Sequence, residues 1–203
     1  MGTRGLAGII YKKKFRIGLY NSMDSYPEGL GLQMVEACQK ISEEYGWDTF
    51  KKTVTEIKII NDKSIPELID VLTYQKNGIF KKQSYPANFD ELLKDLNDDY
   101  PVKILFHIAE GKLKHIHNDI DFIKDSLFCE HAYIINLNTD TLDYYRGFQR
   151  TPDRTNIFGQ KKEDNTYYPC KKIKSYKLDL MKSINSINSE RIVADMIKTK
   201  NEI

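Results

Sequence analysis

Cysteine is scarce in this sequence, and long hydrophobic runs are missing from it. The 203 residues include three cysteines, which are widely spaced and form no C-x-x-C pair: Cys38, Cys129 and Cys170. An odd, dispersed set fits reduced thiols in a cytosol-like compartment and argues against a cysteine-ligated zinc ion. No apolar run approaches the roughly 20 residues that a membrane-spanning helix needs. We therefore expect a soluble, cytoplasmic protein with no membrane partner.

The chain also lacks an excess of charge of either sign. Its 31 basic and 29 acidic residues leave a net charge of +2, which is too small to attract nucleic acid over a distance. We expect no nucleic-acid partner, and any site for an anion has to be local. The length fits a single globular domain over residues 1–203.

Several catalytic signatures are absent as well. The sequence contains no GxxxxGK[ST] phosphate loop and no GxGxxG, GxSxG or HExxH motif. The sequence therefore gives no evidence for the enzyme classes that depend on these motifs, and no cofactor is expected.

Two pairs of short segments rich in β-branched and aromatic residues predict β-hairpins. The first pair is 6–12 and 15–20, separated by lysines, and the second is 131–137 and 141–148, separated by a polar turn. With helices between the hairpins, we predict an α+β fold in which helices pack on a layered sheet of antiparallel hairpins without βαβ units.

Spacing and capping signals predict the remaining elements. Apolar residues three and four apart predict a helix over 30–45, and Ser-x-x-Glu or Asn-x-x-Glu starts predict two more. Residues 102–117 fit either a helix or a strand. The other expected elements are helices at 64–74, 88–96 and 189–198, strands at 53–60 and 173–178, and a long surface loop at 149–169.

The stretch YNSMDSYPEGLG, residues 20–31, joins the first hairpin to the first long helix. Unpaired N–H groups at a helix start can hold an anion or a polar ligand edge. The alternative is a capped turn in which polar side chains bond the backbone. Pairing in the hairpin would bring Arg4 beside Asp24, where a carboxylate could hold the guanidinium toward a ligand. The candidate ligand-binding residues are Thr3, Arg4, Tyr20, Asn21, Asp24, Ser25, Tyr26 and, from the second hairpin, Arg146.

The residues MGTRGLAGIIYKKKFRIGLYNSMDSYPEGLG resemble the start of a group of phage and fungal proteins that open with GTRG, a hairpin and a YN-DSYP-GLG signature. The stretch EHAYIINLNTDTLDYYRGF resembles their later hairpin more weakly. This resemblance implies no particular activity.

The N-terminal layout is also similar to that of N-terminal-nucleophile amidohydrolases such as the choloylglycine hydrolases. The similarity rests on Asn21-Ser22-Met23-Asp24 after a strand hairpin. In those enzymes a cysteine exposed by removal of the first methionine attacks an amide, and its own amine is the base. Here Gly2 occupies that position, so the resemblance implies a retained pocket without the nucleophile.

A rival site is the segment HIHNDID. In an extended segment, alternate residues share one face, and imidazoles with carboxylates can hold Zn²⁺ or Mn²⁺. The four residues concerned are His115, His117, Asp119 and Asp121. In a helix or a loop the shared face is lost.

Together these observations predict a binding protein that captures a small polar, anionic or nucleotide-like molecule. If the chain is phage-encoded, it would act in the host cytoplasm against a host signal. The alternative is an amide or phosphoester hydrolase that uses an activated water or a Thr3 exposed by processing.

Overall fold

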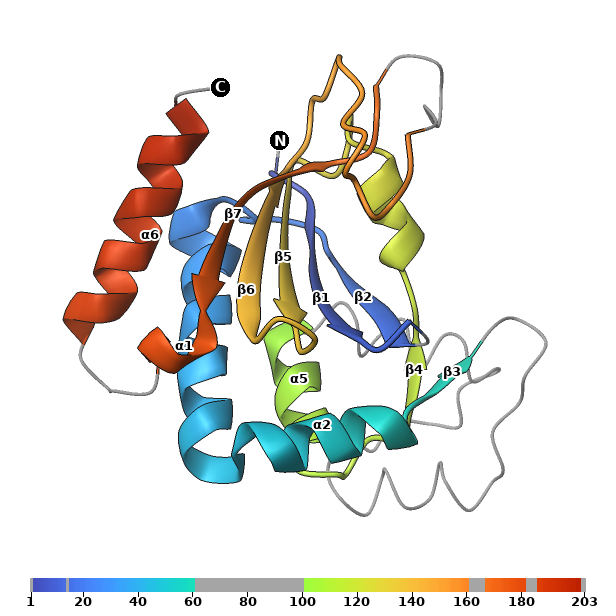
Figure 1. Cartoon of the computed structure of the whole chain (residues 1–203), viewed down its shortest axis with the longest axis vertical. Helices are drawn as coiled ribbons and strands as arrows, with labels where there is room; N and C mark the ends of the chain where they lie inside the picture. Colours follow the sequence, from blue (N-terminus) through green and yellow to red (C-terminus); the bar gives the residue numbers. More distant parts are fainter. Residues whose placement is uncertain (1, 14, 61–100, 161–166, 182–185, 202–203) are drawn as a thin grey trace.

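A mixed five-stranded sheet forms the centre of the protein (Figure 1). The computed structural model describes residues 2–13, 15–60, 101–160, 167–181 and 186–201. The strands lie in the order β2-β1-β5-β6-β7, and helices accompany the sheet, so the predicted α+β fold is confirmed. Their bounds are β1 (Gly5–Tyr11), β2 (Phe15–Asn21), β5 (His131–Asn136), β6 (Thr141–Arg146) and β7 (Lys171–Lys177).

Both predicted hairpins are present, β1 with β2 and β5 with β6. They join through a parallel pairing of β1 with β5, in which Gly5 lies opposite His131 and Ile10 opposite Asn136. The expectation of antiparallel pairing alone was therefore wrong. Local turn signals specify each hairpin but not how two hairpins meet. Because β1 and β5 are both apolar enough to be buried on two faces, they suit the centre of the sheet, where parallel pairing is tolerated.

A long helical segment follows the first hairpin, as the apolar spacing predicted. It consists of a π-helical turn η1 (Pro27–Gly31), helix α1 (Leu32–Lys40) and a second π-helical turn η2 (Ile41–Tyr45). Its apolar stripe is fully buried against the sheet. The segment ends at Gly46, whose φ of 74° favours glycine.

The predicted strand at 53–60 is wrong over most of its length. Helix α2 (Trp47–Glu56) covers its first half, and only β3 (Lys58–Ile60) is extended. Phe50 and Val54 lie four residues apart and are both fully buried, so packing on one helical face outweighs the β propensity of Thr53, Val54 and Thr55.

The segment whose type the sequence left open contains both structures. Helix α5 (Pro101–Ala109) is followed by β4 (His115–His117), which pairs in parallel with β3 in a separate two-stranded sheet. The predicted helices at 64–74 and 88–96 lie outside the described residues.

The predicted strand at 173–178 corresponds to β7, and the predicted helix at 189–198 lies within helix α6 (Ser186–Asn201). A short 3₁₀ helix, η4 (Leu178–Met181), lies between them. A second 3₁₀ helix, η3 (Ile120–Lys124), precedes β5. In the described parts of 149–169, an isolated bridge joins Gln149 to Tyr168.

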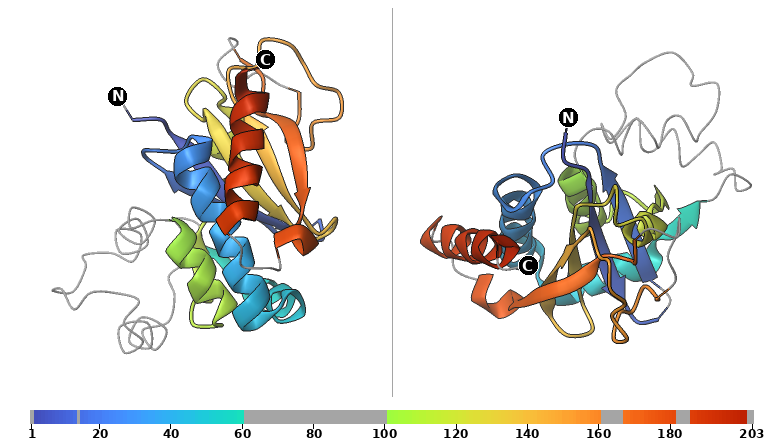
Figure 2. Two further views of the ribbon diagram at one scale, coloured as in Figure 1. Left: turned by 90° about the vertical axis from the view of Figure 1, so that its left-hand side faces the viewer. Right: turned by 90° about the horizontal axis from the view of Figure 1, so that it is seen from above.

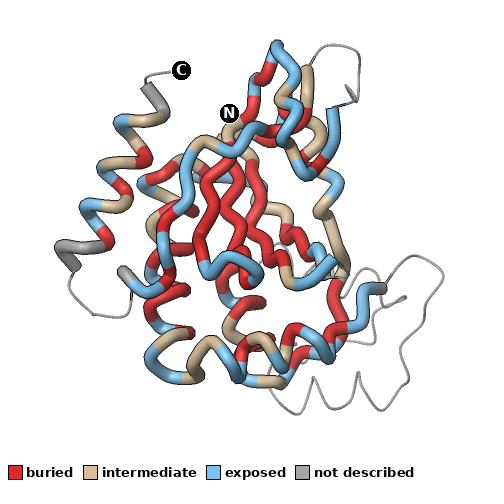
Figure 3. Tube along the Cα trace, in the orientation of Figure 1, coloured by how far each residue is buried: buried red, intermediate tan, exposed pale blue. Residues whose placement is uncertain are grey.

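The two faces of the sheet are covered differently. Side chains from α1, α2, α5 and α6 pack on one face in the larger apolar cluster, and Figure 2 shows α1 and α6 together on that side. We call it the helix face. The other face is covered by η3 and by the loop that carries Phe158. The central strands are buried along their length (Figure 3). Among the described helices, none is long and apolar enough to cross a membrane.

Candidate functional site

The ends of all five strands line up at one edge of the sheet. Pairing places five residues side by side in one row across the strands: Asn21, Gly5, His131, Arg146 and Lys171. We call this row the N-terminal edge, because β1 begins there. Directly paired residues point to the same side of a sheet, so the fold brings Arg146 to the same side as Asn21, as the two-hairpin prediction required.

The stretch YNSMDSYPEGLG folds as a tightly bonded turn at this edge. The Asn21 side-chain amide donates to Ser25 Oγ at 2.7 Å and also to the Met23 carbonyl. The Ser25 N–H donates to the Thr3 carbonyl at 3.1 Å, and the Leu30 N–H donates to the Asp24 carbonyl at 2.8 Å. These bonds hold the turn closed, so the stretch has a structural role of its own, although no side chain caps the start of η1.

Glycine is required in two places for this turn to close. A Cβ on Gly5 would lie 2.3 Å from the His131 carbonyl oxygen and 2.6 Å from Ser25 Cβ. A Cβ on Gly29 would lie 2.0 Å from the Asp24 carbonyl oxygen. Both contacts are far inside van der Waals distance, so Gly5 lets Ser25 pack directly on the start of β1 and Gly29 leaves room for the Asp24 carbonyl.

A buried polar cluster lies beneath the edge on the helix face. His131 Nδ1 and the Tyr144 hydroxyl are hydrogen-bonded at 2.9 Å, and the Tyr133 hydroxyl donates to the Ser25 carbonyl at 3.1 Å. The rings of Tyr133 and Tyr144 stack with centroids 5.3 Å apart. Tyr133 and Tyr144 are thus core positions, and they join Ser25 to the second hairpin.

Burial raises the pKa of Tyr144 to about 12, with the Arg146 charge acting in the opposite direction and that of Glu28 in the same direction. Burial also raises the pKa of Tyr133. Both hydroxyls therefore keep their protons near neutral pH, where each can donate one hydrogen bond.

The structure divides the predicted site residues between the two faces of the edge. Arg4 lies over the Phe128 ring, 4.9 Å from its centroid, and Tyr20 meets the Phe122 ring edge-on at 5.0 Å. Phe122 belongs to η3, so Tyr20 points away from the helix face. Thr3 is tied to the turn through its carbonyl. Asn21 and Arg146 lie in one row on the helix face with β1 and β5 between them, and Ser25 packs on the start of β1.

The predicted pairing of Arg4 with Asp24 was wrong. The Asp24 carboxylate accepts a hydrogen bond from the Tyr26 hydroxyl at 3.0 Å, and among the described residues no ion pair joins it to Arg4. The cause is register: Gly5 is the first paired residue of β1 and lies opposite Asn21. Arg4 therefore precedes the pairing and points to the other face.

The rival metal site does not form among the described residues. Strand β4 ends at His117, whose imidazole pairs with Asp119 at 3.2 Å. Asp121 lies in η3 and pairs with Lys124 instead. Within the described part of the chain, no three histidine, cysteine or acidic side chains are placed to hold a metal ion. The four side chains would share one face only if β4 continued as far as Asp121. It does not, because the chain turns into η3 first.

The three cysteines are buried free thiols. Burial raises the pKa of Cys38 and of Cys129 above the usual range, and Cys170 Sγ donates to the Cys129 carbonyl at 3.1 Å. Cys129 therefore acts as a small buried hydrophobe, because a thiol in this environment is a poor nucleophile.

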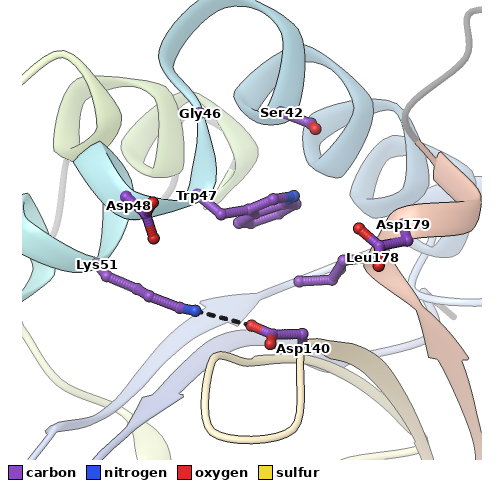
Figure 4. Close-up of a pocket in the computed structure, with 8 residues that line it drawn as sticks. All are labelled: Ser42, Gly46, Trp47, Asp48, Lys51, Asp140, Leu178 and Asp179. Atoms are coloured by element: carbon purple, nitrogen blue, oxygen red, sulfur yellow. Dashed lines mark ion pairs between the residues drawn. The ribbon is translucent and has the colours of Figure 1, made fainter.

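A cavity of about 340 Å³ lies at the other end of the sheet (Figure 4). We call it the Trp47 cavity, and its lining is Ser42, Gly46, Trp47, Asp48, Lys51, Asp140, Leu178 and Asp179. None of these residues was predicted to belong to a functional site. The sequence does place a tryptophan directly after the glycine that ends the first helical segment. It could not reveal the cavity, because the lining comes from three segments that are far apart in the chain.

Comparison of the chain with protein-family models, with curated proteins and with solved structures found no match. The two resemblances noted in the sequence therefore stay predictions. Any functional conclusion has to rest on the geometry described above.

Proposed function

We propose that this protein captures a small polar molecule with an anionic or nucleotide-like part at the helix face of the N-terminal edge. The observation that supports this is the strand register, which places Asn21, His131 and Arg146 in one row. The row places an amide, an imidazole and a guanidinium on one side of the sheet. The imidazole is buried and bonded to Tyr144, and the Asn21 amide donates within its own turn, so the Arg146 guanidinium is the charged group of the site. A guanidinium beside hydrogen-bonding side chains is a common way to hold a phosphate or carboxylate.

The surroundings of the edge favour a ligand with more than one kind of polar group. Glu28 and Arg146 both act on the Tyr144 hydroxyl, with opposite effects on its pKa. The edge therefore carries charges of both signs that are close enough to Tyr144 to act on its hydroxyl. A molecule with an anionic group and separate hydrogen-bond donors, as in a nucleotide, suits such a surface.

Binding is favoured over hydrolysis because, among the described residues, the buried Ser25 and the thiols of Cys38 and Cys129 are not activated as nucleophiles. Ser25 is fully buried, and its Oγ accepts from the Asn21 amide, which cannot serve as a base. Cys38 and Cys129 have raised pKa values, which lowers the thiolate fraction. In a phage setting, which the sequence resemblance implies, capture of a host signalling molecule in the host cytoplasm would be the role of such a protein.

The test is to incubate the purified protein with a metabolite extract, re-isolate it and identify the molecules released on denaturation by mass spectrometry. Arg146→Gln should reduce the recovered ligand about tenfold, because a charge-assisted hydrogen bond is lost. Arg4→Gln is the matched control, since it makes the same change at the same edge but on the other face. It should bind as the unchanged protein does.

Equal loss in both variants, with both still folded, would place the site elsewhere or on both faces. Recovery of a chemically altered molecule, or a mature chain that begins at Thr3, would favour the hydrolase instead.

A further inference from the structure

Two phenylalanine rings are exposed at the end of the sheet where β1 begins. Phe128 precedes β5 and Phe148 follows β6, and each residue is 44% exposed. The Phe148 N–H donates to the Ser126 carbonyl at 2.7 Å, which joins the two loops that carry the rings. Figure 1 shows these loops at the same end of the sheet. Large exposed apolar side chains that gather in one place are typical of interaction sites.

An arginine lies over an aromatic ring at two points of this region. The Arg4 guanidinium is 4.9 Å from the ring centroid of Phe128, and the Arg150 guanidinium is 5.8 Å from that of Tyr167. The Tyr167 ring meets Phe148 edge-on, with centroids 6.1 Å apart. We call these five residues the aromatic surface. It contains the same unit, a guanidinium on a ring, twice.

The two arginines bring positive charge that no acidic side chain balances. In the part of the chain that the structure describes, no carboxylate forms an ion pair with either guanidinium. Glu130 is a neighbour of Arg4, but the bond between them joins its backbone N–H to the Arg4 carbonyl at 3.0 Å. A guanidinium that lies on a ring keeps N–H donors at its rim for an acceptor. The charge of the surface therefore suits an anionic partner.

The backbone of Phe148 indicates that its ring is not placed by packing alone. Its φ is 59°, a left-handed conformation that is uncommon for a phenylalanine and destabilises the folded state. The next residue, Gln149, is buried, and its side-chain amide donates to the Arg146 and Gly147 carbonyls. These bonds hold the turn in place. The fold thus keeps an exposed ring in a strained conformation, and strained residues collect at functional sites.

A partner for this surface has to offer flat rings and negative charges, each more than once. A single nucleotide satisfies one ring and one arginine. An acidic peptide supplies the charges without the rings. A single-stranded nucleic acid repeats a base and a phosphate along its length, and its bases are free to stack on side chains. It is therefore the partner whose chemistry matches both units together.

We propose that the aromatic surface binds single-stranded nucleic acid, with bases stacked on Phe128 and Phe148 and phosphates held by Arg4 and Arg150. The small net charge of the chain, from which we expected no nucleic-acid partner, concerns attraction over a distance. Stacking and two local charges act at contact and do not need a long-range field. The affinity should accordingly depend only weakly on salt.

This site is separate from the one proposed for the small molecule. Arg4 lies on the face opposite the helices, and the row of Asn21, His131 and Arg146 contributes no residue to the aromatic surface. Capture from a metabolite extract tests the helix face, whereas binding of an oligonucleotide tests the aromatic surface. The failure of either proposal therefore leaves the other standing.

The experiment follows the fluorescence anisotropy of an end-labelled oligothymidylate of about ten nucleotides, a usual length for such sites, during titration with the full-length protein. Binding should saturate at micromolar protein concentration. The logarithm of the affinity should fall with that of the salt concentration with a slope of about −1.4, because each of two phosphates contributes about −0.7 on a single strand. The corresponding duplex should bind at least about tenfold more weakly, because its bases stack on one another.

Variants assign the contacts. Phe148→Asn removes the ring and keeps the backbone, because asparagine tolerates a left-handed conformation. It should weaken binding about tenfold, as the loss of one stacked base does, without lowering the melting temperature. Ile59→Asn is the matched control, since Ile59 is 43% exposed and lies in β3 of the separate sheet. Arg150→Gln should reduce the salt slope by about 0.7, whereas Arg191→Gln, at an exposed position in α6, should leave it unchanged.

The proposal is overturned if the folded protein does not bind the oligonucleotide. Equal binding of the duplex, or equal competition by a polyglutamate peptide, would also overturn it, because the surface would then attract any polyanion. Phe128→Ala removes the other exposed ring and should also weaken binding about tenfold. Unchanged binding in both phenylalanine variants, with cooperative melting retained, would show that the rings do not contact the strand and would overturn the proposal as well.

Discussion

At the scale of single residues, Asp24 has two roles in the turn that closes the N-terminal edge. Its backbone is left-handed, with a φ of 55°, a conformation that aspartate and asparagine tolerate better than most residues. Its carboxylate accepts the Tyr26 hydroxyl hydrogen bond. That hydrogen bond is the main cause of the raised pKa of Tyr26, and the negative charge of Asp24 adds to it.

Asp24→Asn separates these two roles, because asparagine tolerates the same backbone but has no charge. We expect the turn to persist and the pKa of Tyr26 to fall toward its ordinary value. NMR titration of ring-labelled tyrosine measures this. Glu28→Gln is the control and should cause a smaller fall, since Glu28 is the weakest of the causes. An unchanged Tyr26 titration in Asp24→Asn would mean that the hydrogen bond does not form in solution.

At the scale of elements, α6 is attached to β7 by a polar clamp. Asp195 of α6 accepts the Tyr176 hydroxyl at 2.8 Å and pairs with Lys174 at 2.6 Å. The Lys174 ammonium, followed by the Tyr176 hydroxyl, lowers the pKa of Asp195, while burial opposes them. The carboxylate is 38% exposed, so solvent screens much of its effect.

Because the folded state lowers the pKa of Asp195, its contribution to stability is complete above the unfolded value near pH 4. It is lost as the pH falls through the folded value. We expect Asp195→Asn to reduce the free energy of unfolding by about 0.5 kcal/mol at pH 7, and the difference to shrink toward pH 3.

Urea denaturation at several pH values measures this without added salt. Glu190→Gln, an exposed change in the same helix, is the control and should have little effect at any pH. A deficit in Asp195→Asn that persists unchanged at pH 3 would contradict the ionic explanation.

At the scale of the whole molecule, the parallel contact between β1 and β5 makes these strands the centre of the sheet. Every residue of β5 is buried, whereas β7 at the sheet edge is mostly exposed. Central strands open only with large parts of the molecule, while edges open locally. We expect backbone amides of β5 to exchange with deuterium at least about tenfold more slowly than those of β7.

Hydrogen exchange read by mass spectrometry on peptides covering 131–136 and 171–177 measures this difference. The short pair of β3 and β4 offers an internal comparison that should also exchange quickly. Equal protection of β5 and β7 would mean that the sheet opens as one unit.

The sequence by itself determined the elements whose signals are local. The β-branched and aromatic content of the two hairpins, the apolar stripe of α1 and the stop at Gly46 all depend on residues near one another in the chain. These elements were predicted correctly because turn chemistry and side-chain periodicity act over a few residues.

Only the tertiary structure decided how these elements meet. Propensity favoured a strand at Thr53–Thr55, but burial of Phe50 and Val54 on one helical face produced α2. Because Gly5 pairs with Asn21, the Arg4 side chain lies on the face opposite the helices. Side chains alternate along a strand, so a change of one residue in register decides which face a side chain occupies. The Trp47 cavity joins residues about a hundred or more positions apart in the sequence, from Trp47 to Asp140 and Asp179. Such contacts depend on long-range packing, which no local pattern records.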